Sequence, residues 1–165
     1  MSALLMIVDV QKGFIGPSTG HVPGQAETLQ EEFDAVIATR FVNPPGSPYR
    51  RWIGWQRFGP GSDDTELAFT PRADALIIDK STYTCVTPDF LTMLKDKDID
   101  RVDICGIATD NCVLKCAVDL FEAGVRPHVH IDACGSHGGP ECHAAGILVM
   151  RRMIGDDQLV EYSLR

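Results

Sequence analysis

Six short apolar runs, separated by segments with a helical pattern, recur along the whole chain. The first run is apolar without a break until Asp9. Strands of this kind have no polar face and are typical of a parallel sheet that is covered on both sides. The sequence therefore predicts parallel strands in six ranges: residues 3–10, 35–42, 74–80, 101–107, 126–134 and 158–162.

The segments between these runs carry start and stop signals for helices. Thr87 is a candidate N-cap with Pro88 in the first turn, and Gly124 is a candidate C-cap. Strands and helices that alternate in this way form right-handed βαβ crossovers with helices on the faces of the sheet. We therefore predict a three-layer α/β/α sandwich, with helices over residues 25–32, 87–98, 111–124 and 140–155.

Size, charge and cysteine content narrow the class of protein. A chain of 165 residues suits one domain, so residues 1–165 are expected to form a single unit. Its net charge of −8 repels phosphate backbones, and no apolar stretch is long enough to span a bilayer, which argues against nucleic acid and membrane partners. The N-terminal residues indicate a strand rather than a signal peptide. The six cysteines are therefore expected to be reduced thiols in a cytoplasmic protein.

The segment of residues 43–72 departs from the regular alternation. It is rich in glycine and proline and holds both tryptophans, Trp52 and Trp55. A connection of this length in a compact domain is often functional. We expect it to leave the sheet at the ligand-binding edge and to line a pocket. The alternative is a surface excursion that the tryptophans pin to the core.

Three reactive side chains fall at one edge of the predicted sheet. Asp9 ends the first strand, Lys80 ends the third, and Cys112 follows the fourth at the start of a helix. Open parallel sheets bind ligands beyond the carboxyl ends of their strands. The three residues are therefore candidate catalytic groups. Each of them alone also fits an ordinary role, as a buried cysteine, a capping aspartate or a solvated lysine.

Each of the three has a chemical task that suits it. The helix N-terminus and the ammonium of Lys80 would lower the pKa of Cys112 and so favour its thiolate. Asp9 would take the thiol proton and return it to a leaving amine. The backbone N–H groups of Ala108 and Cys112 would hold an oxyanion.

Four segments, taken together and in order, resemble the isochorismatase-like cysteine hydrolase family. The resemblance runs over nearly the whole chain. The matched segments are LLMIVDVQKGF, with Asp9, Gln11 and Phe14; IIDKSTYTCV, with Lys80 and Tyr83; ICGIATDNCV, with Cys112; and HIDACGS, followed by His143.

This resemblance implies a six-stranded parallel sheet of Rossmann-like order and a catalytic triad of Asp9, Lys80 and Cys112. It also implies a cis peptide between Ile107 and Ala108, which turns the N–H of Ala108 toward the oxyanion. Family members usually form dimers or tetramers, so a homodimer or homotetramer is expected. Members with the cysteine are mostly amidases, which points to hydrolysis of a carbon–nitrogen bond.

The leading interpretation is a cysteine-dependent amidohydrolase that cleaves a C–N bond of a small amide or a ureido or carbamoyl compound through a thioacyl-enzyme intermediate. The small-molecule substrate is expected to contact Phe14, Trp52, Trp55 and Tyr83. One alternative is a non-catalytic ligand-binding or oligomeric scaffold protein of the same fold. Another is a thiol redox sensor that uses Cys112 with a second cysteine.

Nicotinamidases of the resembled family add a metal site, formed by an Asp-x-His motif and a further histidine after the second strand. The corresponding region here has no histidine and no aspartate before Asp63, so neither a metal nor another cofactor is expected. It offers three arginines, which would either pair with a substrate carboxylate or point outward as a basic rim or subunit contact: Arg50, Arg51 and Arg57. His137 and His143 follow the fifth strand at the same edge, and His143 is expected to be structural.

Overall fold

The computed structural model describes residues 3–161, in which six parallel strands form one sheet with the order β3-β2-β1-β4-β5-β6. The predicted three-layer architecture with a six-stranded parallel sheet is confirmed. The strands are β1 (Leu4–Val8), β2 (Ala35–Phe41), β3 (Leu76–Lys80), β4 (Arg101–Ile107), β5 (Arg126–Gly135) and β6 (Leu159–Val160).

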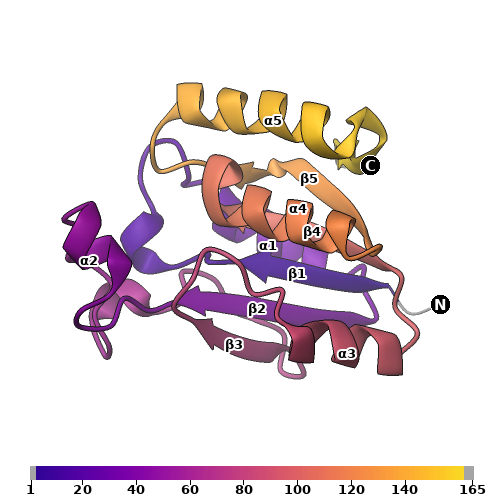
Figure 1. Cartoon of the computed structure of the whole chain (residues 1–165), viewed down its shortest axis with the longest axis horizontal. Coiled ribbons are helices and arrows are strands. Elements are labelled where there is room, and N and C mark those ends of the chain that lie inside the picture. Colours follow the sequence, from indigo (N-terminus) through magenta and orange to yellow (C-terminus); the bar gives the residue numbers. More distant parts are fainter. Residues whose placement is uncertain (1–2, 162–165) are drawn as a thin grey trace.

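Helices cover both faces of this sheet. Figure 1 shows α3 and α4 in front of the strands and α1 behind them. The start signal read from the sequence is present, because the hydroxyl of Thr87 accepts a hydrogen bond from the N–H of Phe90 at the first turn of α3. The helices are α1 (Val22–Gln30), α2 (Pro48–Trp52), α3 (Pro88–Asp96), α4 (Leu114–Glu122) and α5 (Pro140–Ile154).

Several element boundaries differ from the prediction, among them the start of the first helix, which begins at Val22 instead of residue 25, and two of the differences have local backbone reasons. β1 ends at Val8, because Asp9 adopts a left-handed conformation with φ of 49°. The α-helix α4 begins at Leu114 rather than at residue 111, because residues 109–113 form a wide helical turn in which Asn111 has φ of −132° and ψ of −107°. Cys112 therefore lies in a turn before the helix and not in its first regular turn. The predicted strand of residues 158–162 shrinks to β6, and residue 162 lies outside the described residues.

Burial follows the position of each strand in the sheet. Every residue of the central strand β1 is buried. The edge strand β3 is different, because Leu76 is 49% exposed and Ile77 is 37% exposed. The expectation of strands covered on both faces is therefore wrong for β3, which has a neighbouring strand on one side only. No helix within residues 3–161 combines the length and the apolar character that a membrane crossing requires.

The segment of residues 43–72 is ordered and contains a short helix that the sequence analysis did not predict. Ser47 caps α2 by accepting a hydrogen bond from the N–H of Arg50, and Pro48 begins the helix. The side-chain amide of Asn43 binds the carbonyls of Trp55 and Arg57 and so closes the loop. Figure 1 shows α2 beyond the carboxyl ends of the strands. The segment thus leaves the sheet at the expected edge.

Candidate active site

Asp9, Lys80 and Cys112 converge at the carboxyl ends of β1, β3 and β4. Nζ of Lys80 lies 2.7 Å from Oδ2 of Asp9 and 3.6 Å from Sγ of Cys112. All three residues are buried, with exposed fractions of 0% for Asp9, 8% for Lys80 and 6% for Cys112. The predicted convergence of three reactive groups at one sheet edge is therefore present in the structure.

The carboxylate of Asp9 is held from two directions. The hydroxyl of Thr39, on β2, donates to Oδ1 at 2.7 Å, while Lys80 donates to Oδ2. The backbone N–H of Asp9 in turn binds the carbonyl of Thr39. Thr39 was not among the residues predicted from the sequence, where its signal is one polar residue inside an apolar run. These contacts fix the direction in which Asp9 presents its acceptor oxygens.

The ammonium of Lys80 has three acceptors around it. Besides Asp9 and Cys112, it donates to the carbonyl of Thr82 at 2.9 Å, and it lies 5.4 Å from the ring centroid of Phe41. Burial by itself would lower the pKa of Lys80, but attraction to Asp9 and to Cys112 outweighs burial and raises the pKa above its ordinary value. Lys80 is therefore a cation throughout the physiological pH range.

The thiol of Cys112 does not have the lowered pKa that the sequence analysis expected. Burial raises the pKa well above its ordinary value, and the negative charge of Asp9 raises it further. The ammonium of Lys80 acts in the opposite direction but is outweighed, since its charge is already paired with Asp9. The site therefore holds a neutral thiol beside a carboxylate rather than a preformed thiolate.

Two hydrogen bonds anchor the turn that carries Cys112. The hydroxyl of Thr109 lies 2.6 Å from Nδ1 of His143 on α5, and the hydroxyl of Ser136 donates to Asp110 at 2.6 Å. Between them, Gly146 of α5 packs on the backbone of the turn. A Cβ atom at Gly146 would lie 2.7 Å from Cα of Asp110. His143 thus has the structural position expected for it.

The backbone at the end of β4 has two unusual features. Gly106 has φ of +131°, and a Cβ atom there would lie 2.1 Å from the carbonyl oxygen of Val8 on β1. Glycine is therefore required for β4 to approach β1 at this point. The next peptide bond but one, between Ile107 and Ala108, is cis in the structure. The carbonyl of Ala108 accepts hydrogen bonds from the N–H groups of Asn111 and Val113 within the turn.

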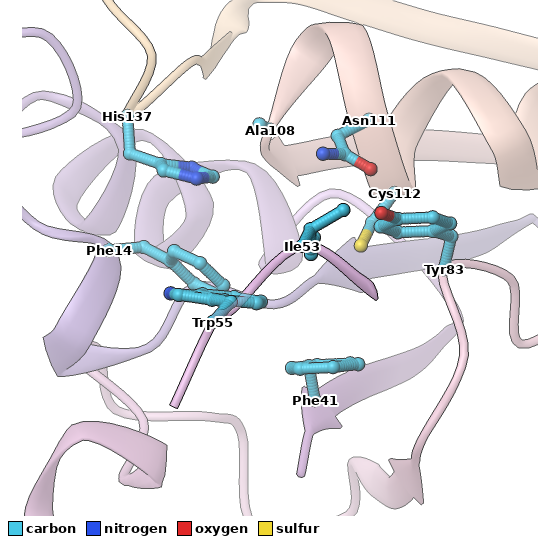
Figure 2. Close-up of a pocket in the computed structure, with 9 residues that line it drawn as sticks. All are labelled: Phe14, Phe41, Ile53, Trp55, Tyr83, Ala108, Asn111, Cys112 and His137. Carbon is cyan, nitrogen blue, oxygen red and sulfur yellow. The ribbon is translucent and has the colours of Figure 1, made fainter. Parts of the chain in front are cut away.

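A cavity of about 320 Å³ opens over Cys112. Figure 2 shows Cys112 and Tyr83 at one end of this pocket, and His137 and Phe14 at the other. A larger cavity of about 460 Å³ lies between β3 and α3, but Cys112 does not line it. We therefore take the smaller cavity as the active-site pocket. Its lining residues are Phe14, Phe41, Ile53, Trp55, Tyr83, Ala108, Asn111, Cys112 and His137.

The structure brings three of the four predicted substrate-binding residues into this pocket. Phe14, Trp55 and Tyr83 line it, whereas Trp52 does not. Trp52 lies at the end of α2, where its side chain is 74% exposed and stacks under the guanidinium of Arg51 at 5.5 Å. The placement of Trp52 in the pocket is thus corrected: the short helix turns its ring outward.

The three arginines of the segment make contacts outside the pocket. Arg50 donates to the carbonyl of Asn43 at 2.9 Å. Arg57 donates to the carbonyl of Gly13 at 3.1 Å. With Arg51 on Trp52, all three guanidinium groups are engaged elsewhere, and none of these residues lines the pocket. Of the two arrangements considered from the sequence, the structure has the outward one.

The residues around the pocket do not fit a bound metal ion. Within residues 3–161, no three His, Cys, Asp or Glu side chains lie close enough together to hold one. Asp64, one of the two nearby aspartates of the segment, accepts hydrogen bonds from Ser62 and from the N–H of Phe58. Besides Cys112, the side chains that line the pocket are four aromatic rings, two aliphatic groups, one amide and one imidazole.

Two further thiols lie behind Cys112. Sγ of Cys85 is 3.9 Å from Sγ of Cys116, and both residues are buried. All six cysteines are free thiols, as expected from the sequence. Behind Cys112 the core is therefore built partly from sulfur, without a covalent link.

Comparison with known proteins places this site in a family. The chain matches the isochorismatase domain model over residues 2–157. It is 54% identical to the nicotinamidase of Acinetobacter baylyi, with 79% of each chain covered. The isochorismatase domain-containing protein 2B of Mus musculus is 37% identical over 57 residues, which span 34% of this chain and 27% of that protein.

A solved structure shares the fold at low sequence identity. The pyrazinamidase of Pyrococcus horikoshii, in complex with zinc, superposes with a TM-score of 0.79 at 22% identity, covering 98% of this chain and 100% of that chain. The family model and the nicotinamidase relative, together with this fold, show that the chain belongs to the isochorismatase family, which confirms the isochorismatase-like hydrolase class predicted from its sequence.

Proposed function

We propose that this protein is a cysteine-dependent amidohydrolase that cleaves a C–N bond of a small amide through a thioacyl-enzyme intermediate. One observation carries the proposal. The Lys80 ammonium lies 2.7 Å from the Asp9 carboxylate and 3.6 Å from the Cys112 thiol, beside a 320 Å³ cavity. Burying the two charges of Lys80 and Asp9 costs free energy of hydration. A protein that only binds a ligand would gain little from bearing that cost beside a thiol. The arrangement suits a nucleophile with its base.

The first half of the reaction uses Asp9 as a proton carrier. Sγ of Cys112 bonds to the amide carbon while the thiol proton passes to the carboxylate of Asp9. The carbonyl electron pair moves to oxygen, and the backbone N–H groups of Ala108 and Cys112 stabilise that oxyanion. Collapse of this intermediate breaks the C–N bond, and Asp9 returns the proton to the departing nitrogen. The products of this half are an amine or ammonia and a thioester on Cys112.

The second half uses the same groups in the reverse order. Water attacks the thioester carbon while Asp9 takes its proton. The C–S bond then breaks, the carboxylic acid is released, and the proton on Asp9 returns to Cys112. Lys80 keeps Asp9 in place and stabilises negative charge as it develops on sulfur. The raised pKa of Cys112 suits this coupled proton transfer, which needs no standing thiolate.

Ammonia release from small amides tests the proposal. Nicotinamide, pyrazinamide, benzamide and N-carbamoylglycine form the first panel, because relatives are named for the first two compounds. Cys112→Ala should abolish turnover, and Asp9→Asn should lower kcat by about 10²–10⁴-fold. Cys142→Ala is the matched control, since Cys142 is partly exposed and does not line the pocket.

Covalent trapping gives an independent measurement. Acid quenching during turnover should leave an acyl group on Cys112, seen as a mass increase on the peptide that contains it. Purified protein that binds these amides without releasing ammonia would contradict the proposal and favour the ligand-binding scaffold. Turnover that survives in Cys112→Ala would exclude the thioacyl route.

The expected homodimer or homotetramer stays a prediction. Three large apolar side chains on α5 are exposed: Leu148, Val149 and Met153. A second copy of the chain would remove such surface from water. Light scattering on the purified protein measures the mass directly.

A further inference from the structure

We propose that His137 determines the specificity of this pocket by forming a hydrogen bond with a polar atom at the far end of an uncharged, planar amide. The amide carbon of that ligand faces Cys112, and its ring packs against the aromatic side chains that line the cavity. This inference rests on the proposed function and names the substrate class of the same site. It stands on the shape of the pocket, its charge and the hydrogen-bonding capacity of His137.

The walls of the pocket favour a flat ligand. The rings of Phe41 and Trp55 are nearly parallel, with an interplanar angle of 11° and centroids 5.6 Å apart. At the other end, Phe14 is stacked on Phe58 with centroids 4.1 Å apart. These contacts hold the rings in fixed orientations, so the cavity keeps its shape without a ligand. Aromatic faces interact well with another ring in offset stacking.

No residue that lines the pocket carries a charge that could pair with a charged substrate. None of the nine lining residues is an aspartate, glutamate, lysine or arginine. Lys80 and Asp9 lie beneath Cys112 and neutralise each other. A ligand with a carboxylate would enter without a cation to pair with it, which is costly in a largely apolar site. The ureido acids considered from the sequence are therefore disfavoured, and uncharged amides are favoured.

His137 is an exposed polar side chain that lines the pocket. Its ring packs on Phe14 with centroids 4.6 Å apart, and it makes no hydrogen bond to any of residues 3–161. Burial lowers its pKa, with a smaller opposing effect from Asp110 and a smaller supporting effect from Arg57. The imidazole is therefore neutral at pH 7 and offers one N–H donor and one acceptor nitrogen.

The imidazole of His137, with its donor and acceptor nitrogens, lies opposite Cys112. Figure 2 shows the imidazole across the pocket from Cys112, with the cavity between them. A planar amide that presents its carbonyl to Cys112 must therefore direct its opposite edge toward His137. A ring nitrogen or another single polar atom at that edge would form a hydrogen bond with the exposed imidazole, whereas a C–H group would displace water from it without replacing the hydrogen bond.

Substitution can separate hydrogen bonding from stacking. His137→Phe keeps a planar ring that can pack on Phe14 but removes both nitrogens. His137→Gln keeps a donor and an acceptor but loses the aromatic ring. If His137 only supports Phe14, the phenylalanine variant should behave like the wild type. If His137 forms a hydrogen bond with the ligand, His137→Gln should retain more of the preference for amides with a polar atom at the far edge than His137→Phe does.

The experiment measures binding, so that it does not depend on turnover. Each His137 variant is made in the Cys112→Ala chain and titrated calorimetrically with benzamide, picolinamide, nicotinamide, isonicotinamide and N-carbamoylglycine. With His137 present, at least one pyridine amide should bind about tenfold more tightly than benzamide, the effect of one good hydrogen bond. His137→Phe should abolish that advantage and change the Kd of benzamide by less than about twofold. N-carbamoylglycine should bind more weakly than every aromatic amide.

Three results would overturn the inference: a pyridine preference that survives in His137→Phe, no preference in the chain with His137, or no binding of any aromatic amide. If His137→Phe does not fold, His137→Leu replaces it in the same comparison. The outcome is separate from that of the proposed function, which is judged by ammonia release from chains that retain Cys112. A His137-dependent preference without turnover would leave this inference standing and remove the amidohydrolase.

Discussion

Nζ of Lys80 lies 2.7 Å from Oδ2 of Asp9, and the two side chains are 5% and 0% exposed. Two buried charges lose their hydration, and only their mutual attraction and further hydrogen bonds compensate for this loss. Thr39 and the carbonyl of Thr82 supply such bonds. The same ammonium is 3.6 Å from Sγ of Cys112, so the buried pair also contacts the proposed nucleophile.

Removal of one partner of this pair should destabilise the fold strongly. Lys80→Met leaves Asp9 buried without its counter-ion, and we expect a loss of about 3–5 kcal/mol in the free energy of unfolding, measured with urea. The double variant Asp9→Asn/Lys80→Met should recover part of this loss, because no uncompensated charge remains. Both variants should lack amidase activity.

An exposed ion pair on the surface provides the control for this prediction. Arg40 and Asp79 form a two-pronged ion pair at 2.7 and 2.9 Å, but their side chains are 38% and 53% exposed. Arg40→Met should therefore cost less than about 1 kcal/mol. Equal losses for the buried and the exposed pair would show that burial does not govern the energetics here.

Alkylation should reveal the raised pKa of Cys112. Because burial and Asp9 both raise this pKa, the rate of iodoacetamide labelling at Cys112 should be low at pH 7 and should rise in the alkaline range. Asp9→Asn removes a negative neighbour and should shift the rate profile to lower pH. Lys80→Met should shift it to higher pH. Peptide mass spectrometry reads each thiol, with the partly exposed Cys142 as the internal reference.

Fast labelling of Cys112 at pH 6–7 in the wild type would contradict this prediction. It would indicate the preformed thiolate that the sequence suggested, with Lys80 outweighing burial. The two variants separate the cases further, since shifts in the same direction would mean that neither charge acts on the thiol directly.

The parallel strands and the sheet edge that gathers the three reactive residues could be predicted because they depend on pattern and position in the chain, whereas the Rossmann-like strand order was implied by the family resemblance. A buried parallel strand ends where its apolar run ends, so Asp9 and Lys80 could be placed at one edge without coordinates. The rule that ligands bind beyond the carboxyl ends then brought Cys112 beside them. The apolar runs on which these steps depend are visible in a single sequence.

Side-chain direction and electrostatics depend on packing that a single sequence does not display. Trp52 and Trp55 are three residues apart in one segment, yet a five-residue helix turns Trp52 outward while Trp55 lines the pocket. The pKa of Cys112 was predicted with the wrong sign, because its value depends on how far burial and Asp9 outweigh Lys80. The pocket position of His137 likewise depends on its contact with Phe14.

The stability of the fold should fall at alkaline pH. Burial raises the pKa of Cys134 to about 12 and raises those of Cys105 and Cys112 well above their ordinary value. In the unfolded chain these thiols ionise near pH 8.5, so above that pH the folded state binds more protons than the unfolded state. The free energy of unfolding should therefore be steady below about pH 8. Above about pH 9 it should decline, by up to roughly 1 kcal/mol per pH unit for each such thiol.

Substitution of one buried thiol checks the origin of this slope. Cys134→Ala removes one titrating group and should make the decline between pH 9 and 10 shallower in urea unfolding. Cys116 acts in the opposite direction, because its hydrogen bond with Cys85 lowers its pKa, and it offsets part of the decline. A free energy of unfolding that stays constant to pH 10 would mean that these thiols are not buried in solution.

A methyl group at Gly146 should displace the turn that carries Cys112. The Cβ atom of Gly146→Ala would lie 2.7 Å from Cα and 2.8 Å from the nitrogen of Asp110, and backbone atoms cannot move aside as a flexible side chain can. We expect α5 and the turn to separate slightly, at a cost of about 1–3 kcal/mol in the free energy of unfolding. Cys112 would shift with the turn, so kcat should fall at least about tenfold, since small displacements of catalytic groups are costly.

Gly24→Ala is the matched control, because Gly24 lies inside α1 with no atom within 4 Å of the added Cβ. That variant should keep full activity and gain about 0.5–1 kcal/mol from better helix propensity. If Gly146→Ala kept wild-type kcat while losing stability, the packing of α5 on the turn would support the fold without positioning Cys112.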